Sequence, residues 1–164
     1  MIVVSDSGPL ISLMKGGQLK VLHSLYGEVL IPEAVFSEVT TNPRYEDEAE
    51  TIRTCDFIRV VTVEDRKAVS LLQRATGLDL GESEAIVFAD NNDADVLLIE
   101  EDAGRQVAKK MQIHVRGSIG ILLYGFDKKV LTADDVDAAL EGMKKAERRI
   151  SKDLYQYAHE YVRR

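Results

Sequence analysis

Acidic side chains stand at four places where apolar segments of the sequence end or are interrupted. They are Asp6 after residues 2–5, Glu38 within 32–40, Glu84 within 78–90, and Glu100 and Asp102 around the end of 95–100. Carboxylates that gather at one point raise one another's pKa values unless a cation lies between them. Hard oxygen ligands without a cluster of His or Cys suit Mg²⁺ or Mn²⁺ rather than zinc. The pattern therefore predicts a carboxylate-bound Mg²⁺ or Mn²⁺.

Glu84 is the acid whose position is hardest to explain without a metal. It lies four residues after Leu80 and three before Val87, in the middle of the apolar face of a helix expected over residues 78–90. An unpaired carboxylate buried there is costly, because an apolar environment disfavours its ionised form. A bound metal ion would remove that cost. We interpret Glu82, in contrast, as an acid that favours the positive N-terminal end of the same helix.

The other acids also have structural explanations, which the sequence leaves open. Asp6 is suited to cap a helix that starts near Pro9, and Glu38 to hold its carboxylate in solvent at the boundary of an apolar face. At least one acid of residues 100–102 is expected to belong only to the start of a helix. Each acid is a weak signal alone, and the metal hypothesis depends on their combination.

Apolar strand-like segments alternate with helical patterns along the chain. Strands are expected at residues 2–5, 57–63, 95–100 and 113–116, with a short strand or extended link at 28–31. Helical patterns occupy the intervening segments, among them 66–76, 103–111 and 117–126. This alternation predicts an α/β fold, a three-layer sandwich with a central, mostly parallel sheet flanked by helices. Ligands of such sheets bind beyond the carboxyl ends of the strands, where the acids stand.

Two more helices are expected at the end of the chain. The first begins at Thr132, where Asp135 completes a capping box. The second carries an apolar stripe of Leu154, Tyr157, Ala158, Tyr161 and Val162. We expect residues 1–126 to form the main domain and residues 127–164 to form a helical extension packed on it. The stripe would face either this core or a second subunit.

Composition narrows the class of protein. The chain has 164 residues, of which 45% are hydrophobic and 30% charged, as in a soluble globular domain. No apolar run approaches the roughly 20 residues that span a bilayer, no secretory signal is visible, and Cys55 is the one cysteine, so we expect a cytoplasmic protein. The net charge of −7 argues against a surface that binds nucleic acid everywhere. Residues 144–164 nevertheless hold seven Lys or Arg against three Asp or Glu, which suits either a solvated helix or an edge that attracts phosphate.

Five segments in order resemble the motifs of a known family. They are DSGPLI, IPEAVFSEV, LDLGESEAIVFA, LLIEEDAGR and GSIGILL, and together they are similar to a PIN domain of the branch related to VapC-type toxins of prokaryotic toxin–antitoxin pairs. The resemblance covers about residues 1–126. It implies a PIN-like fold and a metal-dependent ribonuclease, with Asp6, Glu38 and Glu84 as the first three acids of the centre. For the fourth acid it leaves Glu100, directly after the strand, and Asp102, two residues later.

The resemblance also implies partners. RNA would be the substrate, an antitoxin protein would inhibit the enzyme, and the chain would form a homodimer. Metal-bound carboxylates would activate a water molecule for attack on a phosphodiester, with Ser7 and Arg105 as candidate phosphate contacts. Arg105 is equally suited to balance the charge of the acids. The basic residues expected to admit RNA are Lys109, Lys110, Arg116, Lys144, Lys145, Arg148 and Arg149.

Two other interpretations are compatible with acids at strand ends. A receiver-like signalling domain also collects them, but it requires an aspartate after a middle strand and a lysine after a later one. Here Arg116 takes the position after 113–116, and no aspartate ends a middle strand. A PIN-like module that binds RNA or a partner without cutting is the second alternative, because Glu100 stands where the nearest branch usually has an aspartate.

Overall fold

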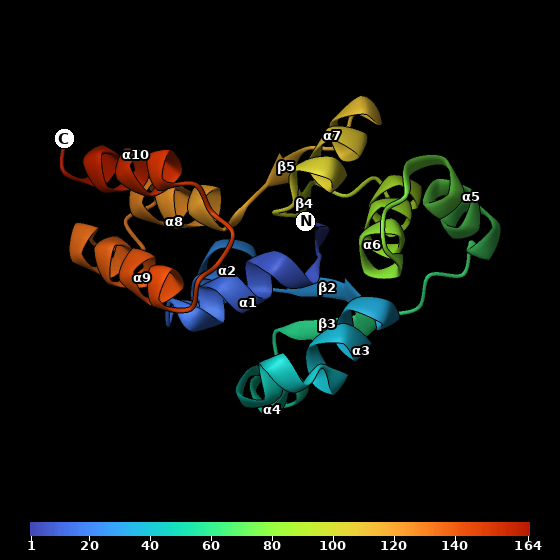
Figure 1. Cartoon of the computed structure of the whole chain (residues 1–164), viewed down its shortest axis with the longest axis horizontal. Coiled ribbons are helices and arrows are strands. Elements are labelled where there is room, and N and C mark those ends of the chain that lie inside the picture. The colour runs from blue at the N-terminus through green and yellow to red at the C-terminus, as the bar shows by residue number, and fades with distance from the viewer.

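A five-stranded sheet forms the centre of the computed structural model, which describes residues 1–164 (Figure 1). Its strands are β1 (Val3–Ser5), β2 (Val29–Pro32), β3 (Ile58–Val61), β4 (Val96–Leu98) and β5 (Val115–Arg116). Their order is β3-β2-β1-β4-β5, and every neighbouring pair is parallel. The predicted fold class is confirmed, and the segment that the sequence left as a strand or a link is strand β2.

Ten α-helices connect and cover the strands. They are α1 (Ser7–Lys15), α2 (Val21–Tyr26), α3 (Glu33–Thr41), α4 (Glu46–Thr54), α5 (Arg66–Thr76), α6 (Leu80–Asn91), α7 (Asp102–Lys110), α8 (Ser118–Asp127), α9 (Ala133–Lys145) and α10 (Lys152–Val162). A short 3₁₀ helix, Pro43–Tyr45, precedes α4. None of these helices combines the length and the apolar character needed to cross a membrane.

The two faces of the sheet are buried against different helices, because side chains alternate between the faces along each strand. Val3 and Leu98 belong to a large core that includes residues of α1, α2, α3, α8, α9 and α10. Val4 and Leu97 pack on the opposite face with residues of α6 and α7. Strands β1 and β4 are therefore buried on both sides, which explains why β4 is apolar throughout and β1 is apolar up to Ser5.

The C-terminal helices pack on the same core as the sheet. The predicted capping box is present, because Thr132 Oγ1 accepts from the Asp135 backbone N–H at 3.1 Å and the Asp135 carboxylate accepts from the Thr132 N–H at 2.9 Å. The apolar stripe expected on α10 divides between two environments. Of its residues, Ala158 and Val162 are buried and Tyr161 is half-buried, whereas Leu154 and Tyr157 are 41% and 47% exposed. Tyr155, which was not part of the predicted stripe, is buried instead.

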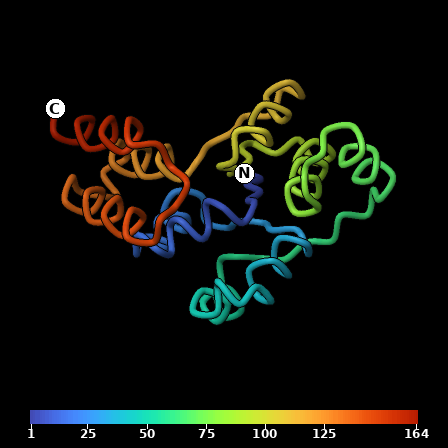
Figure 2. The backbone as a smooth tube through the Cα atoms, viewed as in Figure 1, coloured from blue at the N-terminus to red at the C-terminus, as the bar shows by residue number.

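The link between α9 and α10 returns to the centre of the molecule before α10 runs out to the C-terminus (Figure 2). Arg148 in this link holds it against α1. Its Nε donates to Ser12 Oγ at 2.9 Å, and its Nη2 donates to the carbonyl oxygen of Gly8 at 3.3 Å. The extension therefore reaches the carboxyl edge of the sheet, beside the start of α1.

Helices α1 and α9 meet where only a glycine fits. A Cβ atom on Gly142 would clash with the carbonyl oxygen of Lys15 and lie 3.1 Å from Cα of Gly16. Because both neighbours are backbone atoms, Gly142→Ala is expected to lower the free energy of unfolding by about 1–3 kcal/mol, measured by urea denaturation. The exposed neighbour Glu141→Ala is the control, with a change within about 0.5 kcal/mol. Equal stability of the two variants would contradict the close approach.

Candidate functional site

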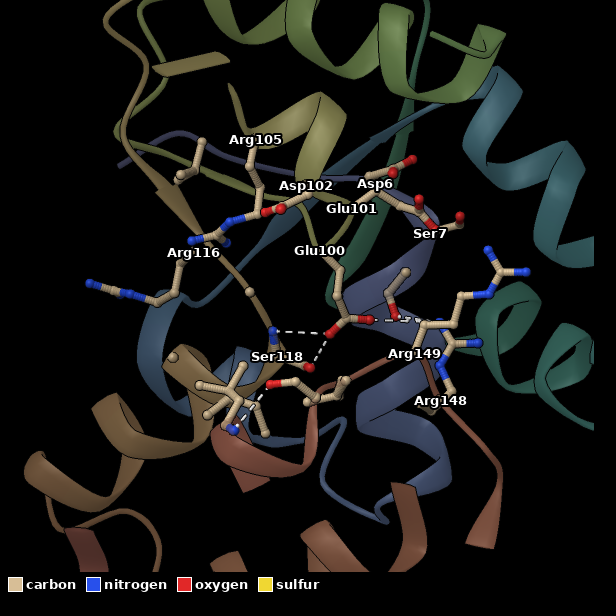
Figure 3. A pocket seen from close by; sticks show the side chains of 18 of the residues that line it. Asp6, Ser7, Glu100, Glu101, Asp102, Arg105, Arg116, Ser118, Arg148 and Arg149 are labelled. Atoms are coloured by element: carbon tan, nitrogen blue, oxygen red, sulfur yellow. Dashed lines mark hydrogen bonds and ion pairs between the residues drawn. The ribbon is translucent and has the colours of Figure 1, made fainter. Parts of the chain in front are cut away.

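A cavity of about 1040 Å³ opens beside the carboxyl ends of β1 and β4 (Figure 3). Its acidic lining residues are Asp6, Glu38, Asp79, Glu82, Glu100, Glu101, Asp102 and Glu147, and its arginines are Arg44, Arg105, Arg116, Arg148 and Arg149. The site lies where ligands of parallel sheets bind. Both signs of charge line it, which suits a cation and a polyanion together.

Asp6 is the most deeply buried acid of the cavity, with 4% of its surface exposed. Its backbone N–H donates to the Leu98 carbonyl at 2.9 Å, which fixes it to the end of β4. Its side chain does not cap α1, and its Oδ1 atom is buried without a hydrogen-bond partner. Burial raises the pKa of Asp6 to about 7, and repulsion from Asp79, Glu38 and Glu101 adds to the effect. A buried carboxylate oxygen without a donor needs a partner that the protein itself does not supply.

Three carboxylates converge on Gly81. A Cβ atom built on this glycine would lie 3.3 Å from Glu38 Oε2, 3.6 Å from Asp6 Oδ1 and 3.6 Å from Asp79 Oδ1. Asp79 Oδ1 also accepts the backbone N–H of Glu82 at 2.8 Å and so caps α6. Because Gly81 has no side chain, the oxygens of three separate segments border one small space.

Glu82 is the fourth acid of this group. Its side chain is largely buried, and a Cβ atom on Gly104 at the start of α7 would lie 3.1 Å from its Oε2. Burial raises the pKa of Glu82 to about 8, and repulsion from Asp79 and Asp6 contributes. The sequence placed Glu82 only at the positive end of its helix. The structure instead brings it to the acids of the cavity.

Glu84 does not line the cavity. Its Oε2 accepts from Arg66 Nη1 at 2.8 Å, and its Oε1 accepts from the backbone N–H of Ala34 at 3.1 Å. Residues two apart on a helix point to nearly opposite sides, so Glu82 and Glu84 cannot serve the same site. Glu84 was a candidate ligand because it lies within an apolar face. In the structure Arg66 and the start of α3 satisfy its carboxylate, so no metal ion is needed there. The structure therefore does not bring Glu84 to Asp6.

Glu100 lines the cavity but is occupied by protein contacts. Its carboxylate accepts from Ser12 Oγ at 2.8 Å and from the hydroxyl of Ser118, and Arg148 Nη2 lies 3.7 Å from its Oε2 (Figure 3). It thus joins the end of β4 to α1, α8 and the α9–α10 link. Among the acids that follow β4, Glu101 is the one whose charge acts on the acidic group of the cavity. It raises the pKa values of Asp6, Glu38 and Glu82.

Asp102, the other candidate for a fourth acid, is the first residue of α7 and is exposed at the rim of the cavity.

Glu38 lies deeper in the cavity than Asp102. Burial raises the pKa of Glu38, whereas a hydrogen bond from the Ser7 side chain lowers it. Ser7 therefore lies near Glu38 in addition to bordering the cavity as a candidate phosphate contact. Asp6 and Glu38, which the sequence singled out, do come together.

The arginines occupy two sides of the cavity. Arg105 and Arg116 lie on one side and Arg148 and Arg149 on the other, with Glu100 and Ser118 between them (Figure 3). Arg105 Nη1 donates to the Ile99 carbonyl at 3.0 Å, which anchors its guanidinium at the end of β4. Arg148 is paired with Glu100, whereas Arg105, Arg116 and Arg149 form no ion pair. Their charge is available to a bound anion.

The acidic group fits a hard divalent cation by its chemistry. The side chains as placed do not form a closed set of three His, Cys, Asp or Glu ligands around one point. The unpartnered Asp6 oxygen, the space over Gly81 and the mutual repulsion of the acids are nevertheless features that a cation would satisfy. The residues that could hold it are Asp6, Glu38, Asp79, Glu82 and Glu101. Glu101 belongs to the three acids that the sequence places after β4, whereas Asp79 carries no signal in the sequence apart from its position at the start of α6.

Comparison with known proteins agrees with this geometry. A search of curated proteins found no match. The DUF3368 family model, described as a PIN domain, matches residues 2–163, so the similarity extends beyond the main domain through the C-terminal helices. PIN domains are generally nucleases and generally use divalent metals. The chain belongs to the PIN domain family.

Proposed function

We propose that this protein is an endoribonuclease that depends on Mg²⁺ or Mn²⁺ and cleaves single-stranded RNA at the acidic end of the cavity. The observation that carries the proposal is the convergence of Asp6, Glu38 and Asp79 on the space over Gly81, with a buried Asp6 oxygen that no protein group satisfies. Membership of a family of nucleases supports the class of reaction.

The roles of the residues follow from their environments. A divalent cation held by carboxylates lowers the pKa of water and stabilises charge on a leaving oxygen. Asp6 and Glu82 would hold the cation, because both carboxylates are desolvated and lack a positive partner. Glu38, whose carboxylate borders the same space over Gly81 as Asp6, would accept a hydrogen bond from the attacking water. Arg105 would contact the phosphate through its forked guanidinium.

We propose, on the resemblance of the motifs to the VapC-type branch, that the protein is the toxin of a toxin–antitoxin pair. A homodimer and an inhibitory antitoxin protein belong to the same proposal. Purification together with the product of a neighbouring gene, followed by loss of RNA cleavage in the complex, would support it. Full cleavage activity in that complex would count against it.

Metal removal tests the nuclease proposal. An end-labelled single-stranded RNA is expected to be cut internally in Mn²⁺ or Mg²⁺ and to remain intact in EDTA. Mn²⁺ at 100 times its dissociation constant is also expected to stabilise the wild type by about 2.7 kcal/mol, or roughly 5–10 °C in Tm.

Asp6→Asn is the matched variant for this test. It is expected to lose both cleavage and stabilisation by Mn²⁺, yet to be at least as stable as the wild type without metal, because it removes a buried charge. Cleavage that persists in EDTA, or that survives in Asp6→Asn, would contradict the proposal. If Mn²⁺ stabilises the wild type but no RNA is cut, the result favours the alternative of a PIN-like module that binds RNA or a partner without cutting.

A further inference from the structure

The cavity extends well beyond the acids. Its lining runs from Asp79 and Glu82 at the start of α6 to Leu154 and Tyr157 on α10. These helices lie on opposite sides of the molecule, with the end of the sheet between them (Figure 1). A volume of about 1040 Å³ is at the upper end of the range of roughly 300–1,000 Å³ for pockets that hold one small molecule. The space therefore suits a segment of a chain rather than a single phosphate group.

Tyr157 presents an aromatic ring at the end of the cavity remote from α6. The side chain is 47% exposed, although it is a large aromatic group beside the buried face of α10. Its ring centroid lies 6.0 Å from that of Tyr161, whose hydroxyl donates to the Asp127 carboxylate at 2.8 and 2.9 Å. The guanidinium of Arg164 lies 5.9 Å from the Tyr157 ring centroid. Tyr161 and Arg164 therefore lie beside the ring, and much of its surface stays accessible.

Two arginines without a carboxylate partner line the same cavity as the acids and Tyr157. Arg149 forms no hydrogen bond or ion pair and reaches toward the side of Asp6 and Ser7 in Figure 3. Arg116 borders the other side, and Arg116 Nη1 donates to Tyr26 Oη at 2.6 Å while its guanidinium lies 4.2 Å from the Tyr124 ring centroid. Arg149 thus has no hydrogen-bond or ion-pair partner, Arg116 is held by Tyr26 and Tyr124, and neither is paired with a carboxylate.

We propose that Tyr157 is a stacking platform for an unpaired base of the RNA, whose phosphates pass along Arg149 and Arg116 toward the acids. The inference rests on the proposed ribonuclease function. It assigns to Tyr157 the selection of single-stranded over double-stranded RNA. Aromatic rings accept any base, whereas a base in a duplex is already stacked and cannot reach the ring. The combination of unpaired arginines and an exposed tyrosine ring matches the ribose-phosphate chain and its bases, and not a free phosphate alone.

The absence of tryptophan from the chain permits a direct test. Tyr157→Trp introduces a single fluorophore at the proposed platform, and Leu71→Trp introduces one on α5, at a residue that is 59% exposed and outside the cavity. Both are made with Asp6→Asn and studied in EDTA, so that RNA is bound but not cut. A 12-nucleotide single-stranded RNA is compared with an abasic ribose-phosphate 12-mer and with a 12-base-pair duplex.

The introduced tryptophan at position 157 is expected to be quenched by the single-stranded RNA and not by the abasic 12-mer or the duplex. The tryptophan at position 71 is expected to respond to none of them. Tyr157→Ala is expected to weaken binding of the intact RNA by roughly 5- to 100-fold and to leave binding of the abasic 12-mer unchanged. Tyr157→Phe keeps the ring and is expected to bind like the wild type.

Three results would overturn the inference. They are unchanged affinity of Tyr157→Ala for intact RNA, equal weakening for intact and abasic RNA, and loss of self-association in Tyr157→Ala without any change in RNA affinity. The last would place the ring in a protein interface. Because binding is measured without metal, failure of the wild type to cut RNA in Mn²⁺ counts against the nuclease proposal alone. Unchanged RNA affinity in a protein that does cut RNA overturns only the stacking platform.

Discussion

Replacing Glu82 by Gln is expected to reduce metal-dependent cleavage of RNA by about 100-fold or more, which corresponds to a few kcal/mol of transition-state stabilisation. The reason is the place of its carboxylate beside Asp6 and Asp79, where burial and repulsion raise its pKa to about 8. A divalent cation would relieve that repulsion. The neutral amide of Gln offers the cation a single oxygen, which is a weaker ligand than a carboxylate. The initial rate of cleavage of an end-labelled RNA in saturating Mn²⁺ measures the effect.

Glu84→Gln is the matched control, because it makes the same change two residues later on the same helix. Its carboxylate is satisfied by Arg66 at 2.8 Å and by the backbone N–H of Ala34 at 3.1 Å, away from the cavity. We therefore expect its cleavage rate to stay within about twofold of the wild type, less than 0.5 kcal/mol in the barrier. The free energy of unfolding of Glu84→Gln should fall instead, because Arg66 loses a charged partner.

The opposite result would reverse the assignment. If Glu84→Gln loses cleavage and Glu82→Gln retains it, while both variants unfold like the wild type, then the third acid is Glu84, as the motif match on the sequence implies. A loss in both would mean that α6 as a whole must be held in place for the centre to form. The pair therefore decides which side of α6 faces the metal.

The sequence was sufficient for the fold because its evidence is local. Alternating apolar and helical segments predicted the parallel sheet, and the uninterrupted apolar residues of β4 predicted burial on both faces. Asp6 could be placed at the site because it ends β1, and all parallel strands end at the same edge. The capping box of α9 was also predictable, since Thr132 and Asp135 are three residues apart.

The orientation of α6 was not predictable, because the helix carries two acids two residues apart and the sequence does not say which of them faces the site. The partner of Glu84 is Arg66 on α5, and no local pattern connects the two residues. The sequence does not reveal that ion pair. Glu84, inside the apolar face, was therefore predicted to be a metal ligand, and Glu82 was interpreted as an acid at the start of a helix. Contacts between distant segments assign the two acids to opposite sides, and such contacts leave no periodicity in the sequence.

Replacing Glu100 by Ala is expected to lower the free energy of unfolding by about 3 kcal/mol, or roughly 6–12 °C in Tm. The carboxylate accepts from Ser12 and Ser118 and pairs with Arg148, and little of it is exposed to solvent. Its removal leaves Arg148 without its only carboxylate partner at a largely buried position and frees the α9–α10 link from β4. Urea denaturation measures the loss, and the exposed neighbour Glu101→Ala is expected to change stability by less than about 0.5 kcal/mol.

Glu100→Gln then separates a structural role from a role as the fourth acid. The amide can still accept hydrogen bonds from both serines, so a smaller loss of stability is expected than for Glu100→Ala. If Glu100 only joins β4 to α1, α8 and the link, Mn²⁺ should raise the Tm of Glu100→Gln by as much as it raises that of the wild type. In that case Glu101→Gln should reduce the Mn²⁺ response, because Glu101, and not Glu100, is the acid after β4 whose charge raises the pKa of Asp6. A Glu100→Gln variant that folds but no longer responds to Mn²⁺ would identify Glu100 as a metal ligand, which must then exchange its serine contacts for the cation on binding.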